Sequence, residues 1–207
     1  MTLDTLILVT IISGLGMISP GPDFVLIVKN SLSYNRKLAL FTCLGVIMAI
    51  FVHMSYCVAG IAVIITATPW LFNTLRYAGA AYLIWLGIKA LLTKESTITY
   101  ISKSTNKQLI STKTAFMQGF LCNLLNPKAT LFFLAIFTQV LNANSSLSDK
   151  LLVAWIIWVE AVFWWPFVVF IFQTQAIQRR YFKAQFIIDK LLGVILTTLG
   201  IKVALGF

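Results

Sequence analysis

Six apolar stretches, each long enough to cross a lipid bilayer, dominate this chain of 207 residues. They lie near residues 4–28, 38–66, 70–92, 115–140, 150–173 and 187–205. A helix of about 20 apolar residues crosses the hydrocarbon layer, where a chain satisfies its backbone polar groups only as helices or as a closed barrel. Hydrophobic residues make up 59% of the chain, and its mean hydropathy is +0.92. We therefore predict an all-α integral membrane protein with six transmembrane helices.

The first and fourth stretches are each interrupted by proline. Their sequences read Ser19-Pro20-Gly21-Pro22-Asp23 and Asn123-Leu124-Leu125-Asn126-Pro127-Lys128. Proline inside a helix costs about 3 kcal/mol, because it lacks an N–H group and clashes with the preceding turn. Paired breaks in the two halves of a membrane protein mark the binding site of many transporters. We predict broken helices at spans one and four, with two simple packing kinks as the alternative.

The chain divides into two halves of three spans each, residues 1–92 and 115–207. The polar segment 93–114 joins them and is expected to be a flexible cytoplasmic connector. Leu-Gly-Ile-Lys occurs near the end of both halves, at 86–89 and 199–202. An odd number of spans per half makes the second copy cross the membrane in the opposite direction. This predicts one membrane domain built as an inverted repeat of two three-helix units.

Basic residues are unevenly distributed between the loops of this chain, whose formal net charge is +10. Eleven Lys and Arg residues lie in segments 29–37, 94–113 and 179–190, against three on the opposite side. The positive-inside rule places the three basic segments in the cytoplasm and both termini in the periplasm. Membrane-spanning stretches flank each cluster, so nucleic acid is not the expected partner. The first stretch is too long for a signal peptide and is expected to remain in the protein.

The helices that restart after the breaks predict a site for a zwitterion. Their N-terminal ends carry partial positive charge and backbone N–H groups that suit a carboxylate. Asn126 is expected to cap the helix at Pro127, and Ser19 the helix at Pro20. The carbonyls that the prolines free would accept bonds from an ammonium group, and they belong to Gly16, Ile18 and Asn123. The candidate substrate-binding residues are Ser19, Pro20, Gly21, Pro22, Asp23, Asn123, Asn126, Pro127 and Lys128.

The predicted spans contain the ionisable residues Asp23, His53, Lys128 and Glu160, whose burial is costly and points to function. Lys128 is expected to hold a substrate carboxylate, and Asp23 to hold an ammonium group or exchange a proton. A structural ion pair, or a lysine that extends to the interface, is the alternative. Glu160 is a second candidate for proton coupling, or a residue of an outer aqueous vestibule. His53 is expected to be a hydrogen-bonded structural residue.

Other classes of protein find less support in the sequence. Three dispersed cysteines and a single histidine give no disulfide framework and no metal-ligand spacing, so neither a cofactor nor a bound metal is expected. No nucleophile–base pair suggests an enzyme. The small residues Gly79-Ala80-Ala81 and Gly87 favour close helix packing or a homodimer.

Three motifs occur in order along the chain. They are Ser-Pro-Gly-Pro-Asp in span one, the string Arg-Tyr-Ala-Gly-Ala-Ala-Tyr-Leu-Ile-Trp-Leu-Gly at 76–87, and Asn123 followed by Asn126-Pro127-Lys128. Together they give the chain a resemblance to the LysE/RhtB family of amino-acid exporters. This resemblance implies hallmark positions at Pro20, Gly21, Pro22, Asn126, Pro127 and Lys128. Many members read Phe-Pro-Gln-Phe where this chain has Phe-Thr-Gln-Val at 137–140, which leaves the substrate range open.

The resemblance also implies an activity. It implies a multi-pass carrier of the bacterial inner membrane that exports amino acids of the homoserine, threonine or lysine type, or homoserine lactones. The expected mechanism is proton antiport by alternating access, with a small-molecule substrate, protons and the lipid bilayer as partners. A metal-cation exporter of the wider LysE-like superfamily, a membrane enzyme or a structural subunit remains the alternative.

Overall fold

A computed structural model describes residues 1–19, 21–67, 69–92, 110–141 and 145–174, and parts of 184–205. Within these residues the chain is helical and contains no strand, as predicted. The named helices are α1 (Leu3–Ile18), α2 (Pro22–Ser33), α3 (Arg36–Ala67), α4 (Pro69–Leu92), α5 (Thr112–Leu124), α6 (Pro127–Val140) and α7 (Leu147–Phe172). Residues 193–198 are also helical.

Both predicted breaks are present. Helix α1 ends at Ile18 and α2 begins at Pro22, with a bend of 56° between them. Helix α5 ends at Leu124 and α6 begins at Pro127, with a bend of 55°. In each pair a proline occupies the first turn of the second helix, where its missing N–H group costs nothing. The expectation of broken helices at spans one and four is confirmed.

Helix lengths agree with a membrane protein. Among the described residues, α7 and residues 36–60 of α3 are long and apolar enough to cross a membrane, and four spans result if each bent pair counts as one. In α4, the apolar part Tyr77–Leu92 is shorter. The stretch at 187–205 lies partly outside the described residues, as do positions 93–109 of the connector, so the count of six spans stays a prediction.

Some helix boundaries differ from those expected. Helix α5 begins at Thr112 rather than at 115, because the side chain of Ser111 accepts a hydrogen bond from the N–H group of Thr114 (3.0 Å) and caps the first turn. Helix α2 continues to Ser33, beyond the expected end of the first stretch at 28. The polar first turn of α5 and the polar last turn of α2 therefore extend these helices past the apolar residues.

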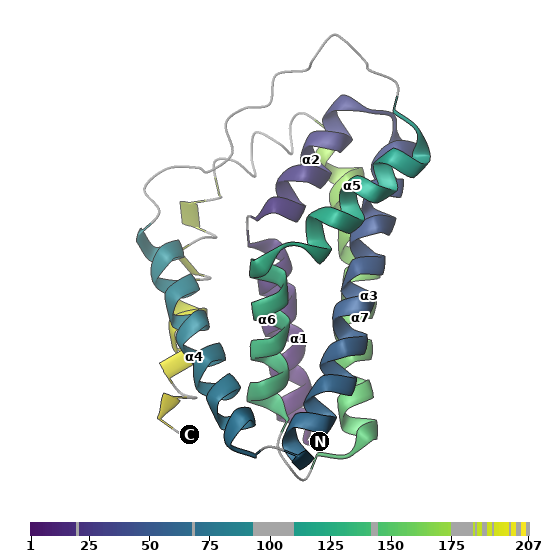
Figure 1. The fold of residues 1–207 in the computed structure, drawn as a ribbon. Coiled ribbons are helices and arrows are strands. Elements are labelled where there is room, and N and C mark those ends of the chain that lie inside the picture. Colours follow the sequence, from purple (N-terminus) through teal and green to yellow (C-terminus); the bar gives the residue numbers. More distant parts are fainter. Residues whose placement is uncertain are drawn as a thin grey trace.

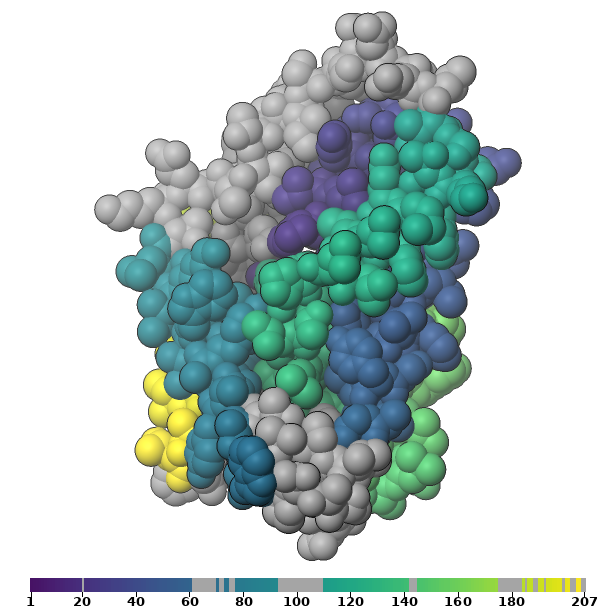
Figure 2. All heavy atoms as spheres, viewed as in Figure 1, coloured from purple at the N-terminus to yellow at the C-terminus, as the bar shows by residue number. Residues whose placement is uncertain are grey.

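The helices lie roughly side by side, with the two bends near the middle of their length (Figure 1). Helix α3 packs against α5 and α7, α4 packs against α6, and α1 packs against α7 and α6. The start of α1 and the described residues 204–205 lie at the same end of the molecule (Figure 1). In the space-filling view, α5 and α6 run across the visible face between α4 and α3 (Figure 2).

Glycines allow the closest helix approaches. A Cβ atom at Gly119 of α5 would collide with the backbone of Thr42 in α3, and one at Gly45 of α3 would collide with the backbone of α5. In α4, Gly79 faces Ala135 of α6, and Gly87 faces Gly193. The small residues of spans two and three therefore serve packing within the chain, as small residues do in many membrane helices. A homodimer stays a prediction.

The crossing of α3 and α5 generates a prediction. Replacing Gly119 with alanine should lower the melting temperature of the detergent-solubilised protein by several degrees, because the new methyl group forces the helix backbones apart, at about 1–3 kcal/mol. The control is Gly60→Ala in α3, where a Cβ atom meets no atom within 4 Å. Alanine there should leave the melting temperature unchanged or raise it slightly. Equal melting temperatures for the two variants would contradict the packing described.

Candidate functional site

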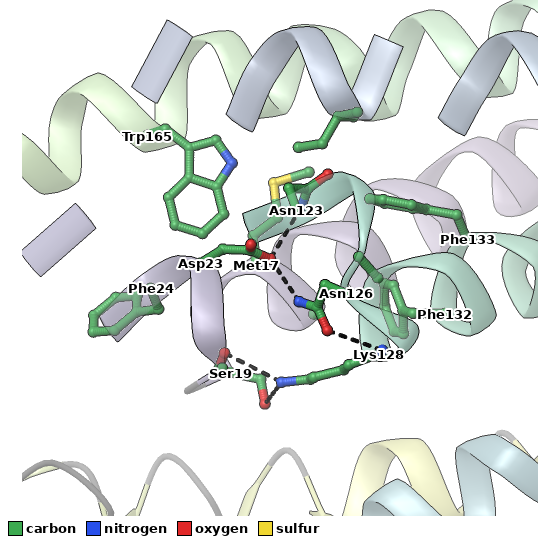
Figure 3. Close-up of a pocket in the computed structure, with 14 residues that line it drawn as sticks. Met17, Ser19, Asp23, Phe24, Asn123, Asn126, Lys128, Phe132, Phe133 and Trp165 are labelled. Atoms are coloured by element: carbon green, nitrogen blue, oxygen red, sulfur yellow. Dashed lines mark hydrogen bonds between the residues drawn. The ribbon is translucent and has the colours of Figure 1, made fainter. Parts of the chain in front are cut away.

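The two breaks meet at one small cavity. Its volume is about 40 Å³, more than the roughly 10–15 Å³ that holds one water molecule. The cavity is bounded by α1, α2, α3, α5, α6 and α7, and its lining residues are Gly16, Met17, Ser19, Gly21, Asp23, Phe24, Ile50, Asn123, Asn126, Lys128, Ala129, Phe132, Phe133 and Trp165. Figure 3 shows these residues converging from both breaks. The structure thus brings together six of the predicted site residues, which lie a hundred positions apart in the sequence.

Asp23 lies in the first turn of α2, and only 8% of it is exposed. Its Oδ2 atom accepts hydrogen bonds from Asn123 Nδ2 (3.0 Å) and from Asn126 Nδ2 (2.9 Å). The dashed lines of Figure 3 trace both bonds. Hydrogen bonds to a carboxylate are stronger than neutral ones and offset part of the cost of burying its charge. A carboxylate of the first break is therefore held by two amides of the second.

Asn126 uses both ends of its side-chain amide. Its Oδ1 atom accepts a hydrogen bond from the backbone N–H group of Lys128 (3.0 Å) and so caps α6, as predicted. Its Nδ2 atom donates to Asp23. Because the capping bond fixes the orientation of the amide, the N-terminus of α6 also positions the donor that reaches Asp23.

Lys128 reaches back to the first break. Its Nζ atom donates to Ser19 Oγ (2.9 Å) and to the Ser19 carbonyl (3.4 Å). A Cβ atom at Gly21 would lie 3.2 Å from this ammonium group, so the missing side chain makes room for it. The expectation that Ser19 caps the second helix of the first span is wrong. Ser19 ends α1, and Gly21 is the N-cap of α2 and makes no side-chain cap bond.

The expectation of a free carbonyl at Asn123 is also wrong. That carbonyl accepts a hydrogen bond from the N–H group of Asn126 (3.0 Å) and lies 3.2 Å from His53 Nε2. Pro127 has no N–H group to donate to this carbonyl, as a residue four positions further along a helix normally would. A tighter turn brings the N–H group of Asn126 to it instead. His53 is 1% exposed, and its Nδ1 atom also contacts the hydroxyl of Tyr56. These contacts agree with the structural role expected for His53.

The prolines shape the site rather than line it. Pro22 and Pro127 are exposed and do not border the cavity, although both were expected to bind substrate. Each occupies the first turn of its helix and fixes where that helix begins. Pro20 lies outside the described residues, so the structure says nothing about its expected role.

Three polar atoms of the cavity residues have no hydrogen-bond partner among the described residues. They are Asp23 Oδ1, Asn123 Oδ1 and Trp165 Nε1. A buried polar atom that is left unpaired costs about 1–3 kcal/mol. Trp165 was not among the residues singled out from the sequence. The chain offered one signal, since Trp165 directly precedes the only proline inside α7, Pro166.

Glu160, the second candidate for proton coupling, lies outside this cavity. Its Oε2 atom accepts a hydrogen bond from Ser13 Oγ across the contact between α7 and α1. It borders a separate groove whose other lining residues are Thr10, Gly14, Met17, Ile18, Val159, Phe163, Trp164 and Phe167. Met17 lines both the groove and the cavity, so the two spaces adjoin at this side chain.

The arrangement suits non-covalent binding of a small polar molecule. One carboxylate and one ammonium group face the same cavity, and phenylalanines supply much of the remaining wall. No cluster of three or more His, Cys, Asp or Glu side chains that would hold a metal ion occurs in the part of the chain that the structure describes. The site residues therefore offer charge complementarity and hydrogen bonds.

Comparisons with known proteins agree with the resemblance seen in the sequence. Over 201 residues the chain is 34% identical to the uncharacterized membrane protein YrhP of Bacillus subtilis, covering 94% of this chain and 96% of the relative. It is 26% identical over 190 residues to the threonine efflux protein of Escherichia coli K12, with 92% of each protein covered. It is 32% identical over 126 residues to the leucine efflux protein of Salmonella choleraesuis, covering 61% of this chain and 58% of the relative.

No solved structure matches the chain. The family model described as LysE type translocator matches residues 15–206, which include both breaks and Glu160. This match covers nearly the whole chain. The protein is a multi-pass membrane protein that belongs to the LysE type translocator family.

Proposed function

We propose that this protein exports amino acids or close derivatives across the bacterial inner membrane by alternating access. The observation that carries the proposal is the cavity where the two breaks meet, because it combines the Asp23 carboxylate with the Lys128 ammonium group. Two of its relatives are named threonine and leucine efflux proteins, which supports an amino acid as the cargo. The family resemblance supports export as the direction.

A zwitterion fits this charge pattern. Its ammonium group is complementary to Asp23, whose Oδ1 atom accepts no bond from the described residues. Its carboxylate is complementary to Lys128 and to the N-terminus of α2, which carries partial positive charge and no side-chain cap. Lys128 must exchange its bonds to Ser19 for bonds to the substrate. This exchange links substrate binding to the first break.

The proposed architecture is an inverted repeat of two three-helix units, residues 1–92 and 115–207, joined by the connector 93–114. The nearly equal bends of 56° and 55° support it, because related units should be broken alike. In each half the bent pair packs against a long helix of the other half, α2 with α7 and α5 with α3. Rocking of one unit against the other would expose the cavity to the two sides in turn, with both termini in the periplasm.

Proton antiport supplies the driving force in this proposal. Asp23 and Glu160 are the candidate carriers, since Asp23 is buried, Glu160 is partly buried, and each has one buried oxygen without a partner among the described residues. Glu160 is the carrier that lies apart from the substrate cavity. A separate position allows a proton to bind without displacing the substrate directly.

Reconstitution tests the proposal. The purified protein in liposomes should exchange labelled amino acids in counterflow, and an imposed pH gradient should drive their net movement. The panel should contain threonine, homoserine, leucine, lysine and a homoserine lactone, together with divalent cations. Folded protein that moves none of the amino acids or lactones would refute the proposed function. Flux of divalent cations alone would favour a metal exporter.

Replacement of Lys128 with alanine should abolish transport, because the site loses its ammonium group. The amount of protein in the membrane should stay unchanged, since α6 keeps its Asn126 cap. Initial transport rates in proteoliposomes measure the effect. The control is Lys29→Ala, which removes an exposed lysine of α2 and should leave the rate within about twofold. Transport that persists in Lys128→Ala would assign the carboxylate to the helix ends alone.

Replacement of Glu160 with glutamine should separate proton coupling from substrate movement. Glutamine keeps the size of the side chain and can still accept a bond from Ser13, but it cannot carry a proton. Counterflow should continue, whereas the response to a pH gradient should fall at least about tenfold. The control is Asp4→Asn, which neutralises an exposed carboxylate in the first turn of α1. A normal response to the gradient in Glu160→Gln would leave Asp23 as the candidate carrier.

A further inference from the structure

Two acceptors and one donor that have no hydrogen-bond partner among the described residues border the same cavity. The acceptors are Asp23 Oδ1 and Asn123 Oδ1, and the donor is Trp165 Nε1. All three residues are more than nine-tenths buried, with exposed fractions of 8%, 2% and 3%. In Figure 3 the indole ring of Trp165 lies beside Asp23 and Asn123, on the opposite side of Asp23 from Lys128.

Protein structures rarely leave three buried polar atoms unpaired around one cavity. Water molecules can satisfy all three, and so can a ligand that carries a group with several N–H donors and, next to it, an oxygen that accepts a hydrogen bond. An ammonium group has three N–H donors and no acceptor, and a carboxylate has acceptors only. An α-amino acid carries both groups on one carbon atom.

We propose that Trp165 is a substrate-binding residue whose indole N–H donates to the carboxylate of a bound amino acid. The ammonium group of the substrate lies between Asp23 Oδ1 and Asn123 Oδ1. The assignment deepens the proposed function and rests on it. The indole N–H is an additional donor to the substrate carboxylate in the conformation seen here, in which the Lys128 ammonium group is hydrogen-bonded to Ser19.

The cavity walls restrict the side chain of the substrate. Asp23 and Lys128 are the charged residues among the described residues that line the cavity, and Asp23 is assigned to the α-ammonium group. A basic side chain would therefore enter without a counter-ion, which is strongly unfavourable in a buried site. The apolar walls come from Phe24, Ile50 and Phe132. Together with the volume of about 40 Å³, they favour a small uncharged side chain.

The test begins with substrate analogues and the unmodified protein. Competition against counterflow of the best amino acid should be strong for small neutral amino acids and at least about tenfold weaker for three analogues. The first is the N-acetyl derivative, which lacks the ammonium group. The second is the amine without the carboxylate, and the third is lysine. Equal competition by the N-acetyl derivative would overturn the assignment of the ammonium position.

The second step replaces Trp165 with phenylalanine, which removes the N–H group and keeps an aromatic ring. The apparent KM for the amino acid should rise about tenfold while the maximal rate stays within about twofold, since a hydrogen bond to a charged group is lost. The preference for the amino acid over its amine should shrink by a similar factor. Trp155→Phe is the matched control, because that tryptophan lies on the same helix and is 61% exposed.

The results separate failure of this assignment from failure of the proposed function. An unmodified protein that carries no amino acid refutes the function. Transport with the same KM and the same preference in Trp165→Phe overturns the assignment alone. If Trp165→Phe does not reach the membrane, Trp165→Leu and Trp165→Met take its place, because both also lack the N–H group. A smaller preference for the amino acid over its amine in either variant supports Trp165, and an unchanged preference overturns its role.

Discussion

The bond pair that holds Asp23 is the interaction on which the rest of the structure depends. A carboxylate at the start of α2 accepts from two amides, one at the end of α5 and one at the cap of α6. Burying a charge is very unfavourable unless it is paired or hydrogen-bonded. The two breaks therefore cannot move apart without exposing the carboxylate to water or giving it a new partner. A substrate ammonium group, or a proton, is such a partner.

The same bonds explain why costly breaks persist in an apolar environment. A break frees backbone groups that lipid cannot satisfy. At the second break, the side chain of Asn126 caps α6, and its backbone N–H group donates a hydrogen bond to the Asn123 carbonyl. At the first break, Lys128 binds the carbonyl and the hydroxyl of Ser19. The polar groups of each break are thus hydrogen-bonded partly within that break and partly by residues of the other.

The sequence predicted the helices, the position of both breaks and the cap at Asn126, because these depend on local chemistry. Proline has no N–H group, and asparagine before proline is a strong cap signal. The cap of α2 was assigned wrongly to Ser19 because two prolines flank Gly21, and either can begin a helix. The expectation of a free carbonyl at Asn123 was wrong because a tighter turn brings the N–H group of Asn126 to it. Trp165 was missed because only the packing of α7 decides which of its tryptophans faces the cavity.

The proposed coupling between Glu160 and the cavity needs only a short physical connection. An element that links two sites must be able to adopt two arrangements that both sites influence. Helix α1 lies where such an element would have to lie. Ser13 bonds to Glu160, Met17 lines both the groove at Glu160 and the cavity, and Ser19 at the end of the helix binds Lys128. These three residues lie within two turns of one helix end, next to the break that releases α1 from α2. A shift of this short segment would change the Ser13–Glu160 contact, the cavity wall and the Lys128 contact together.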